Sequence, residues 1–160
     1  MQFLYKVLFP VYDEEIFKNN NFHAMKRIAI NYNELFLRYK NNYNLNLLEM
    51  SYKINSNDKE LLEYKFKIES RYFGYTIHEI PSGVLYGMNG ATIEETKKNL
   101  LALEEFELIA KKIGQNQDEL ISECRYYYRT WIDYLENKPH NMYYAEYLTA
   151  IEELSFDGSS

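Results

Sequence analysis

Hydrophobic and polar positions alternate with a period of two over residues 47–54 and again over 62–69. The polar, turn-forming sequence Asn55-Ser56-Asn57-Asp58 separates the two runs. Alternation on both sides of such a turn is typical of an antiparallel hairpin with one buried and one hydrated face. The hydrophobic set is Leu48, Met50, Tyr52, Ile54, Leu62, Tyr64, Phe66 and Ile68. The pattern therefore predicts a β-hairpin, which a third strand over 72–80 extends into a meander.

Two further elements are predicted in the N-terminal part. Residues 2–9 are apolar on both faces of an extended chain and stop at Pro10, which indicates a covered strand in the same sheet. Hydrophobic residues at helical spacing predict one helix over 22–39, with Asn20 and Asn21 as candidate N-caps. We expect this helix to pack across the sheet.

The pattern becomes helical in the C-terminal part of the chain. Thr92 and Glu95 form a capping-box motif at the start of a helix that ends at Gly114. Apolar stripes at helical spacing predict two more helices, which begin near Asn116 and Tyr144. The predicted fold class is α+β, with an N-terminal antiparallel β-meander and one packed helix, followed by a C-terminal three-helix region.

Size and composition agree with one globular unit. The chain has 160 residues, of which 46% are hydrophobic and 26% are charged, and no apolar run approaches the roughly 18 residues of a membrane span. We expect a single α+β domain over 1–156, sheet-rich over 1–90 and helical over 91–156. Residues 157–160 are expected to be a disordered tail or a cloning remnant.

Charge is distributed unevenly along the chain. The formal net charge is −6, and residues 61–160 carry 17 acidic against 10 basic side chains, while 1–60 carry 7 against 8. Such a molecule repels nucleic acid and anionic lipid. We therefore expect no membrane binding and no direct nucleic-acid binding, and a partner with a basic surface.

The sequence contains no recognisable catalytic constellation. The three histidines lack metal-ligand spacing, and Cys124 lies on an apolar helical stripe, where a thiol behaves as a small hydrophobe. We expect no enzyme, no metal and no cofactor, although a closed pocket holding His78 or His140 beside a carboxylate would favour catalysis. The single cysteine and the lack of a signal sequence at the N-terminus predict a cytoplasmic protein.

One segment resembles a known DNA-binding unit. Ile109-Ala110-Lys111-Lys112-Ile113-Gly114, followed by Leu120, is similar to the first helix and turn of a helix-turn-helix motif. The resemblance implies a DNA-binding regulator or antitoxin that uses residues 106–129. The would-be recognition helix, however, opens with the acidic pair Asp118-Glu119. This alternative requires Lys111, Lys112, Arg125 and Arg129 to share an exposed face clear of carboxylates.

Tyrosine is the most unusual feature of the composition. Seven of the 17 tyrosines lie between residues 126 and 147, more than one helical stripe can bury, because adjacent residues on a helix point about 100° apart. Tyrosines up to residue 75 fall largely on the buried-face registers of the predicted elements. Exposed tyrosines set among charged residues are typical of protein interfaces. The candidate partner-binding residues are Tyr126, Tyr143, Tyr147, Glu119, Glu123 and Arg129.

Together these features predict a non-enzymatic, acidic protein-binding module. It is expected to inhibit a larger, basic-surfaced protein, such as a nuclease or another nucleic-acid-binding protein, by steric occlusion. Small size, acidity and the lack of catalytic residues are typical of phage anti-defence and toxin-immunity proteins, an analogy of properties alone. The many Asn, Lys and Tyr residues indicate an AT-rich bacterial or phage source. The sequence leaves homo-oligomerisation open.

Overall fold

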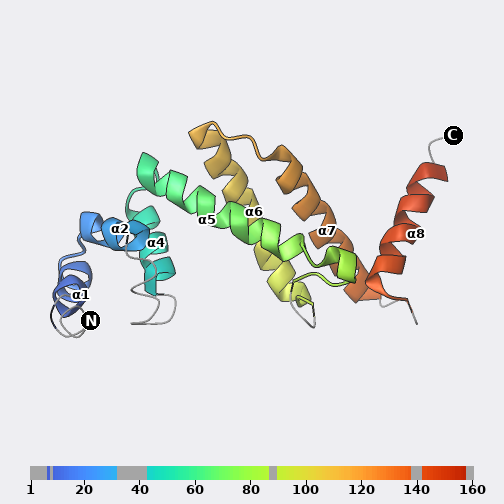
Figure 1. Ribbon diagram of the computed structural model, residues 1–160, viewed down its shortest axis with the longest axis horizontal. Coiled ribbons are helices and arrows are strands. Elements are labelled where there is room, and N and C mark those ends of the chain that lie inside the picture. Colours follow the sequence, from blue (N-terminus) through green and yellow to red (C-terminus); the bar gives the residue numbers. More distant parts are fainter. Residues whose placement is uncertain (1–6, 8, 32–42, 87–89, 138–141, 158–160) are drawn as a thin grey trace. The chain divides into compact units, whose positions relative to one another are not determined.

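The computed structural model describes residues 7, 9–31, 43–86, 90–137 and 142–157 (Figure 1). These residues form helices joined by turns, and none of them lies in a strand. The predicted α+β fold with a β-meander is therefore wrong. By their internal contacts the residues divide into two compact units, Met1–Lys65 and Phe66–Ser160. The expectation of a single domain over 1–156 stays a prediction.

Among its described residues, the first unit contains three helices and the start of a fourth. These are α1 (Phe9–Phe17), α2 (Phe22–Asn31), α4 (Tyr43–Ile54) and the first turns of α5 (Lys59–Ile77). Helix α2 packs against both α1 and α4. The buried apolar side chains of this unit are Ile16, Met25, Ile28, Ala29, Leu47, Leu48, Leu61 and Leu62.

Two N-terminal predictions reach residues outside the described part. The helix predicted over 22–39 is confirmed over 22–31, and the rest of it lies outside the described residues. The strand predicted over 2–9 lies there too, apart from Val7 and Phe9, and Phe9 is the first residue of α1.

The predicted hairpin is two helices. Residues 47–54 belong to α4 and residues 62–69 to α5, and the third predicted strand over 72–80 is the end of α5 and the start of η2 (Ile80–Ser82). Eight of the eleven residues 59–69 are Lys, Glu or Leu, which favour helix, whereas β-branched residues are scarce.

Burial in this region follows a helical rather than a strand period. Lys65 was expected on a hydrated face but is 3% exposed. Its ammonium group lies 2.7 Å from the Glu49 carboxylate and 5.2 Å from the centre of the Tyr52 ring. Buried positions along α5 are spaced three, four or eight residues apart, which places them on one helical face. They are Leu61, Leu62, Lys65, Phe73 and Thr76.

The turn between the two runs was predicted correctly, although it joins helices. The Asp58 carboxylate accepts a hydrogen bond of 3.0 Å from the Leu61 backbone N–H and so caps the start of α5. It also forms an ion pair of 2.9 Å with Lys26 on α2. Burial opposes ionisation of Asp58, but these hydrogen bonds hold its pKa below the ordinary value.

The second unit contains the rest of α5, the short helix η2 and the three helices predicted from the sequence. These are α6 (Ile93–Ile113), α7 (Asp118–Asn137) and α8 (Tyr144–Asp157). Helices α6 and α7 run antiparallel, side by side (Figure 1). The capping box of Thr92 and Glu95 is present, and Gly114 ends α6 with a left-handed φ of 69°.

A continuous apolar core joins these helices. Trp131 on α7 donates a hydrogen bond of 2.7 Å from Nε1 to the carbonyl of Ala91. Tyr128 donates to Thr76, which in turn donates to the carbonyl of Phe73. The buried side chains of the core are Phe73, Ile80, Leu85, Ala91, Leu103, Phe106, Ile121, Cys124, Tyr128, Trp131, Tyr144 and Leu148.

Candidate functional site

Helix α7 has a buried side and an outward side. Ile121, Cys124, Tyr128 and Trp131 face the core. Glu119, Glu123 and Tyr126 are exposed and are spaced four and three residues apart, so they share one outward face. Three of the candidate residues are therefore neighbours on the helix surface.

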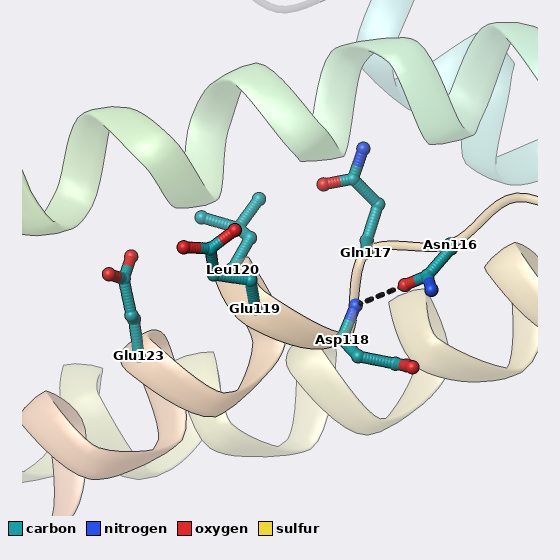
Figure 2. Close-up of a pocket in the computed structure, with 6 residues that line it drawn as sticks. All are labelled: Asn116, Gln117, Asp118, Glu119, Leu120 and Glu123. Carbon is teal, nitrogen blue, oxygen red and sulfur yellow. Dashed lines mark hydrogen bonds between the residues drawn. The ribbon is translucent and has the colours of Figure 1, made fainter.

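The start of α7 borders a first hollow of about 590 Å³. Figure 2 shows Gln117, Glu119 and Glu123 projecting to the same side of the chain. The loop before the helix is held by a hydrogen bond of 2.9 Å from the Asp118 backbone N–H to Asn116 Oδ1 (Figure 2). Three carboxylates line the hollow, those of Asp118, Glu119 and Glu123.

A second hollow of about 510 Å³ lies between α7, α8 and the end of α5 with η2. Its apolar lining includes Ile77, Ile80 and Leu148, and Glu123 and Glu152 add two carboxylates. Glu123 lines both hollows, so the two adjoin. We call the two hollows together the acidic groove.

The ionisable side chains of the acidic groove are mostly carboxylates. Its lining contains four carboxylates, one histidine and no lysine or arginine among the residues that the structure describes. Tyr126 adjoins the groove next to Glu152. Burial, and in addition the Glu152 carboxylate, raise the pKa of the Tyr126 hydroxyl. The groove therefore combines an apolar lining with an acidic rim.

His78 lines the second hollow, but its ring nitrogens are engaged elsewhere. Nδ1 donates to the backbone carbonyl of Tyr75, and Nε2 lies 2.9 Å from the Glu79 carboxylate. The hollow is open to solvent. It therefore differs from the closed pocket around a histidine and a carboxylate that would have favoured catalysis. His140 lies outside the described residues, within which no cluster of three His, Cys, Asp or Glu side chains could hold a metal ion.

No protein-family model matches the chain, and comparison with curated proteins and with solved structures finds no match either. The site must therefore be interpreted from its own residues. Across the described helices, none is both long and apolar enough to cross a membrane.

The other predicted site residues do not line the acidic groove. Arg129 is exposed, but it follows Glu123 by six positions, which places the two about 120° apart around α7. Tyr143 precedes α8 and is 79% exposed. Tyr147 donates its hydroxyl to Asp133 on α7, and this hydrogen bond raises its pKa to about 12. Its ring also packs on Tyr134, so Tyr147 joins α8 to α7.

Sequence reasoning missed the residues that complete the groove. Leu148 and Glu152 lie four residues apart on α8, a spacing that could have marked one helical face. Ile77 and Ile80 lie in the segment over 72–80 that the sequence predicts to be a strand. Nothing local in the sequence indicates that these three segments meet.

The DNA-binding alternative needs basic side chains that are free of carboxylates, but two of its four basic residues form ion pairs with a glutamate. Lys111 and Arg125 both bind Glu107, at 2.6 and 2.7 Å. These hydrogen bonds lower the pKa of Glu107. Two of the four basic residues therefore converge on an acid instead of presenting a face clear of carboxylates.

Cys124 belongs to the core and not to the groove. Its thiol is fully buried and lies 3.7 Å from the carbonyl of Phe73. Burial raises its pKa to about 12. A thiol that stays protonated is a poor nucleophile, which gives Cys124 a packing role.

Proposed function

We propose that this protein is a non-enzymatic, acidic protein-binding module that inhibits a larger protein by occupying a basic surface with its acidic groove. The observation that carries the proposal is the lining of the groove, with four carboxylates, an apolar floor and no lysine or arginine among the described residues. The carboxylates are those of Asp118, Glu119, Glu123 and Glu152.

Two physical effects support a basic protein as the partner. Carboxylates gathered along one surface attract lysine and arginine side chains and accelerate association. The apolar floor, with Ile77, Ile80 and Leu148, can accept one apolar side chain of the partner and exclude water from the contact. Charge then favours basic partners, and the floor favours those with an apolar anchor.

The same charge disfavours DNA as the ligand. Helix α7 begins with Asp118 and Glu119, which would face phosphate groups if this helix entered a groove of DNA. Two of the four basic residues that a helix-turn-helix would need, Lys111 and Arg125, are paired with Glu107. We therefore propose an inhibitor that acts in the cytoplasm on a nucleic-acid-binding target. In this it would resemble an anti-defence or immunity protein.

Affinity capture from cells of the source organism tests this function. The full chain is compared with a groove variant, Glu119→Gln/Glu123→Gln/Glu152→Gln. A matched control, Glu63→Gln/Glu94→Gln/Glu104→Gln, changes the net charge equally but alters exposed glutamates outside the groove lining. Circular dichroism checks that both variants keep the helical fold.

We expect the wild type and the control to capture the same basic protein, and the groove variant to retain at most a tenth of it. Equal capture by the groove variant contradicts the proposal. So does an acidic protein as the specific partner, or the absence of any partner of the wild type.

A further inference from the structure

A second exposed feature of the second unit consists of tyrosine rings. Tyr72 and Tyr75 near the end of α5 and Tyr86 after η2 are all exposed, Tyr75 to 57%. The centre of the Tyr86 ring lies 6.2 Å from that of Tyr72 and 5.9 Å from that of Tyr75. The Tyr86 ring is inclined to them by 62° and 83°. We call these three residues the aromatic patch.

The rings of the aromatic patch are held in place before any ligand arrives. Tyr72 donates its hydroxyl to Asn99 on α6 at 2.9 Å. Tyr75 stacks on His78, with 4.4 Å between the ring centres. Tyr86 has a left-handed φ of 52°, which a non-glycine residue adopts only when its surroundings hold it there. Binding would therefore require little ordering of these side chains.

Two carboxylates, those of Glu79 and Glu95, lie near the aromatic patch. Burial raises the pKa of the Tyr72 hydroxyl, and the nearby Glu95 carboxylate raises it further. Glu79 binds His78, which stacks on Tyr75. His78 also lines the second hollow, so the aromatic patch adjoins the acidic groove.

Exposed ring faces close to carboxylates favour a cation as the ligand. The quadrupole of a tyrosine ring attracts positive charge to its face. A planar guanidinium group stacks on such a face, whereas the strongly hydrated ammonium group of lysine loses more hydration there. Nucleic-acid bases also stack on tyrosine, but their phosphates would be repelled by the carboxylates.

We propose that the aromatic patch binds an arginine side chain of the basic partner. This proposal rests on the function proposed above, and it adds a chemical preference to it. The acidic groove attracts any basic segment, and the aromatic patch selects arginine over lysine.

The experiment uses the full chain and three fluorescein-labelled probes, with binding measured by fluorescence anisotropy. The probes are a nonaarginine peptide, a nonalysine peptide and a single-stranded oligothymidylate. The variants Tyr75→Ala and Tyr75→Leu remove the most exposed ring of the patch, and the leucine variant keeps an apolar side chain there. Phe17→Ala removes an exposed aromatic ring of the first unit, outside the patch and the groove, as the control. Glu123→Gln/Glu152→Gln weakens the acidic groove alone.

We expect the wild type to bind nonaarginine about threefold more tightly than nonalysine, the effect of one exposed cation–π contact. Both Tyr75 variants should bring this ratio close to one without changing the affinity for nonalysine. The groove variant should weaken the binding of both peptides and keep the ratio, and the Phe17 control should change neither quantity.

The possible failures are distinguishable. A wild type with equal affinity for both peptides, or a preference that survives both Tyr75 variants, overturns the arginine assignment. The proposed function stands in that case if both peptides depend on Glu123 and Glu152. If neither peptide binds, the acidic groove does not take basic chains, and both proposals are wrong. Tighter binding of a single-stranded oligothymidylate than of nonaarginine also overturns the assignment.

Discussion

At the scale of single residues, Gly90 has little freedom to change. Its φ of 73° lies in the left-handed region, and an added Cβ would lie 2.4 Å from Cζ2 of Trp131. Trp131 cannot withdraw easily, because it packs in the core and binds the carbonyl of Ala91. Backbone strain and overlap therefore act together at this position.

We expect Gly90→Ala to lower the free energy of unfolding by about 2 kcal/mol or more. Gly74→Ala is the matched control, since Gly74 lies inside α5 with nothing within 4 Å of the added Cβ. That change should raise stability by about 0.5–1 kcal/mol, because alanine is the better helix former. Urea unfolding followed by circular dichroism measures both. Equal effects of the two substitutions would show that Trp131 does not crowd Gly90.

Cys124 provides a second test at this scale, based on its pKa of about 12. At pH 8 the buried thiol should stay protonated and react with a disulfide reagent only after the protein is unfolded. The folded-state pKa lies above the ordinary value, so the stability that the thiol contributes is complete below about pH 9 and decreases as the pH rises toward 12. Rapid labelling of the native protein at pH 8 would contradict this account.

At the scale of elements, the sequence predicted helices best where their ends have local signals. The capping box of Thr92 and Glu95 and the terminal Gly114 involve neighbouring residues, and they place α6 correctly. Alternation over eight residues is a weaker signal, because apolar side chains at every second position can also be half-buried around a helix, as Tyr64, Phe66 and Ile68 are in α5. The high helix propensity of Lys, Glu and Leu was the better guide to α5.

Asp58 is the residue that connects the start of α5 to α2, through its hydrogen bond to Leu61 and its ion pair with Lys26. Asp58→Ala removes both contacts and should destabilise the protein by about 1–2 kcal/mol. Asp58→Asn can still cap the helix and should cost less. Urea unfolding at pH 7 compares the three proteins, and equal losses in both variants would contradict the capping role.

The ion pair also predicts a pH dependence. Burial opposes the charged form of Asp58, but Lys26 and the Leu61 N–H outweigh it, so the pKa in the folded state lies below the ordinary 3.8. The stability contributed by the carboxylate is therefore present above that pH and is lost as the pH falls through the folded-state value. The stability difference between wild type and Asp58→Asn should shrink in this acidic range. A difference that stays constant would contradict the ion pair.

At the scale of the whole molecule, the composition showed which residue types are in excess but not where in the fold their side chains are exposed. The acidic C-terminal part and the tyrosine excess were both visible in the sequence. Which tyrosines are exposed depends on which helices cover them: Tyr128 and Tyr144 are buried, whereas Tyr72 and Tyr75, expected to be largely buried, are exposed. The acidic groove was not predictable for the same reason, because it forms only where α5, η2, α7 and α8 meet.

Photo-crosslinking in cells of the source organism tests the central claim most directly. Benzoylphenylalanine replaces Tyr126 beside the acidic groove or, as the control, Leu101 on the exposed face of α6. The account predicts one discrete crosslink to a basic protein from position 126, none from position 101, and loss of the crosslink when Glu119, Glu123 and Glu152 are changed to Gln. A crosslink from position 101 alone, or one from position 126 that survives these changes, would contradict it.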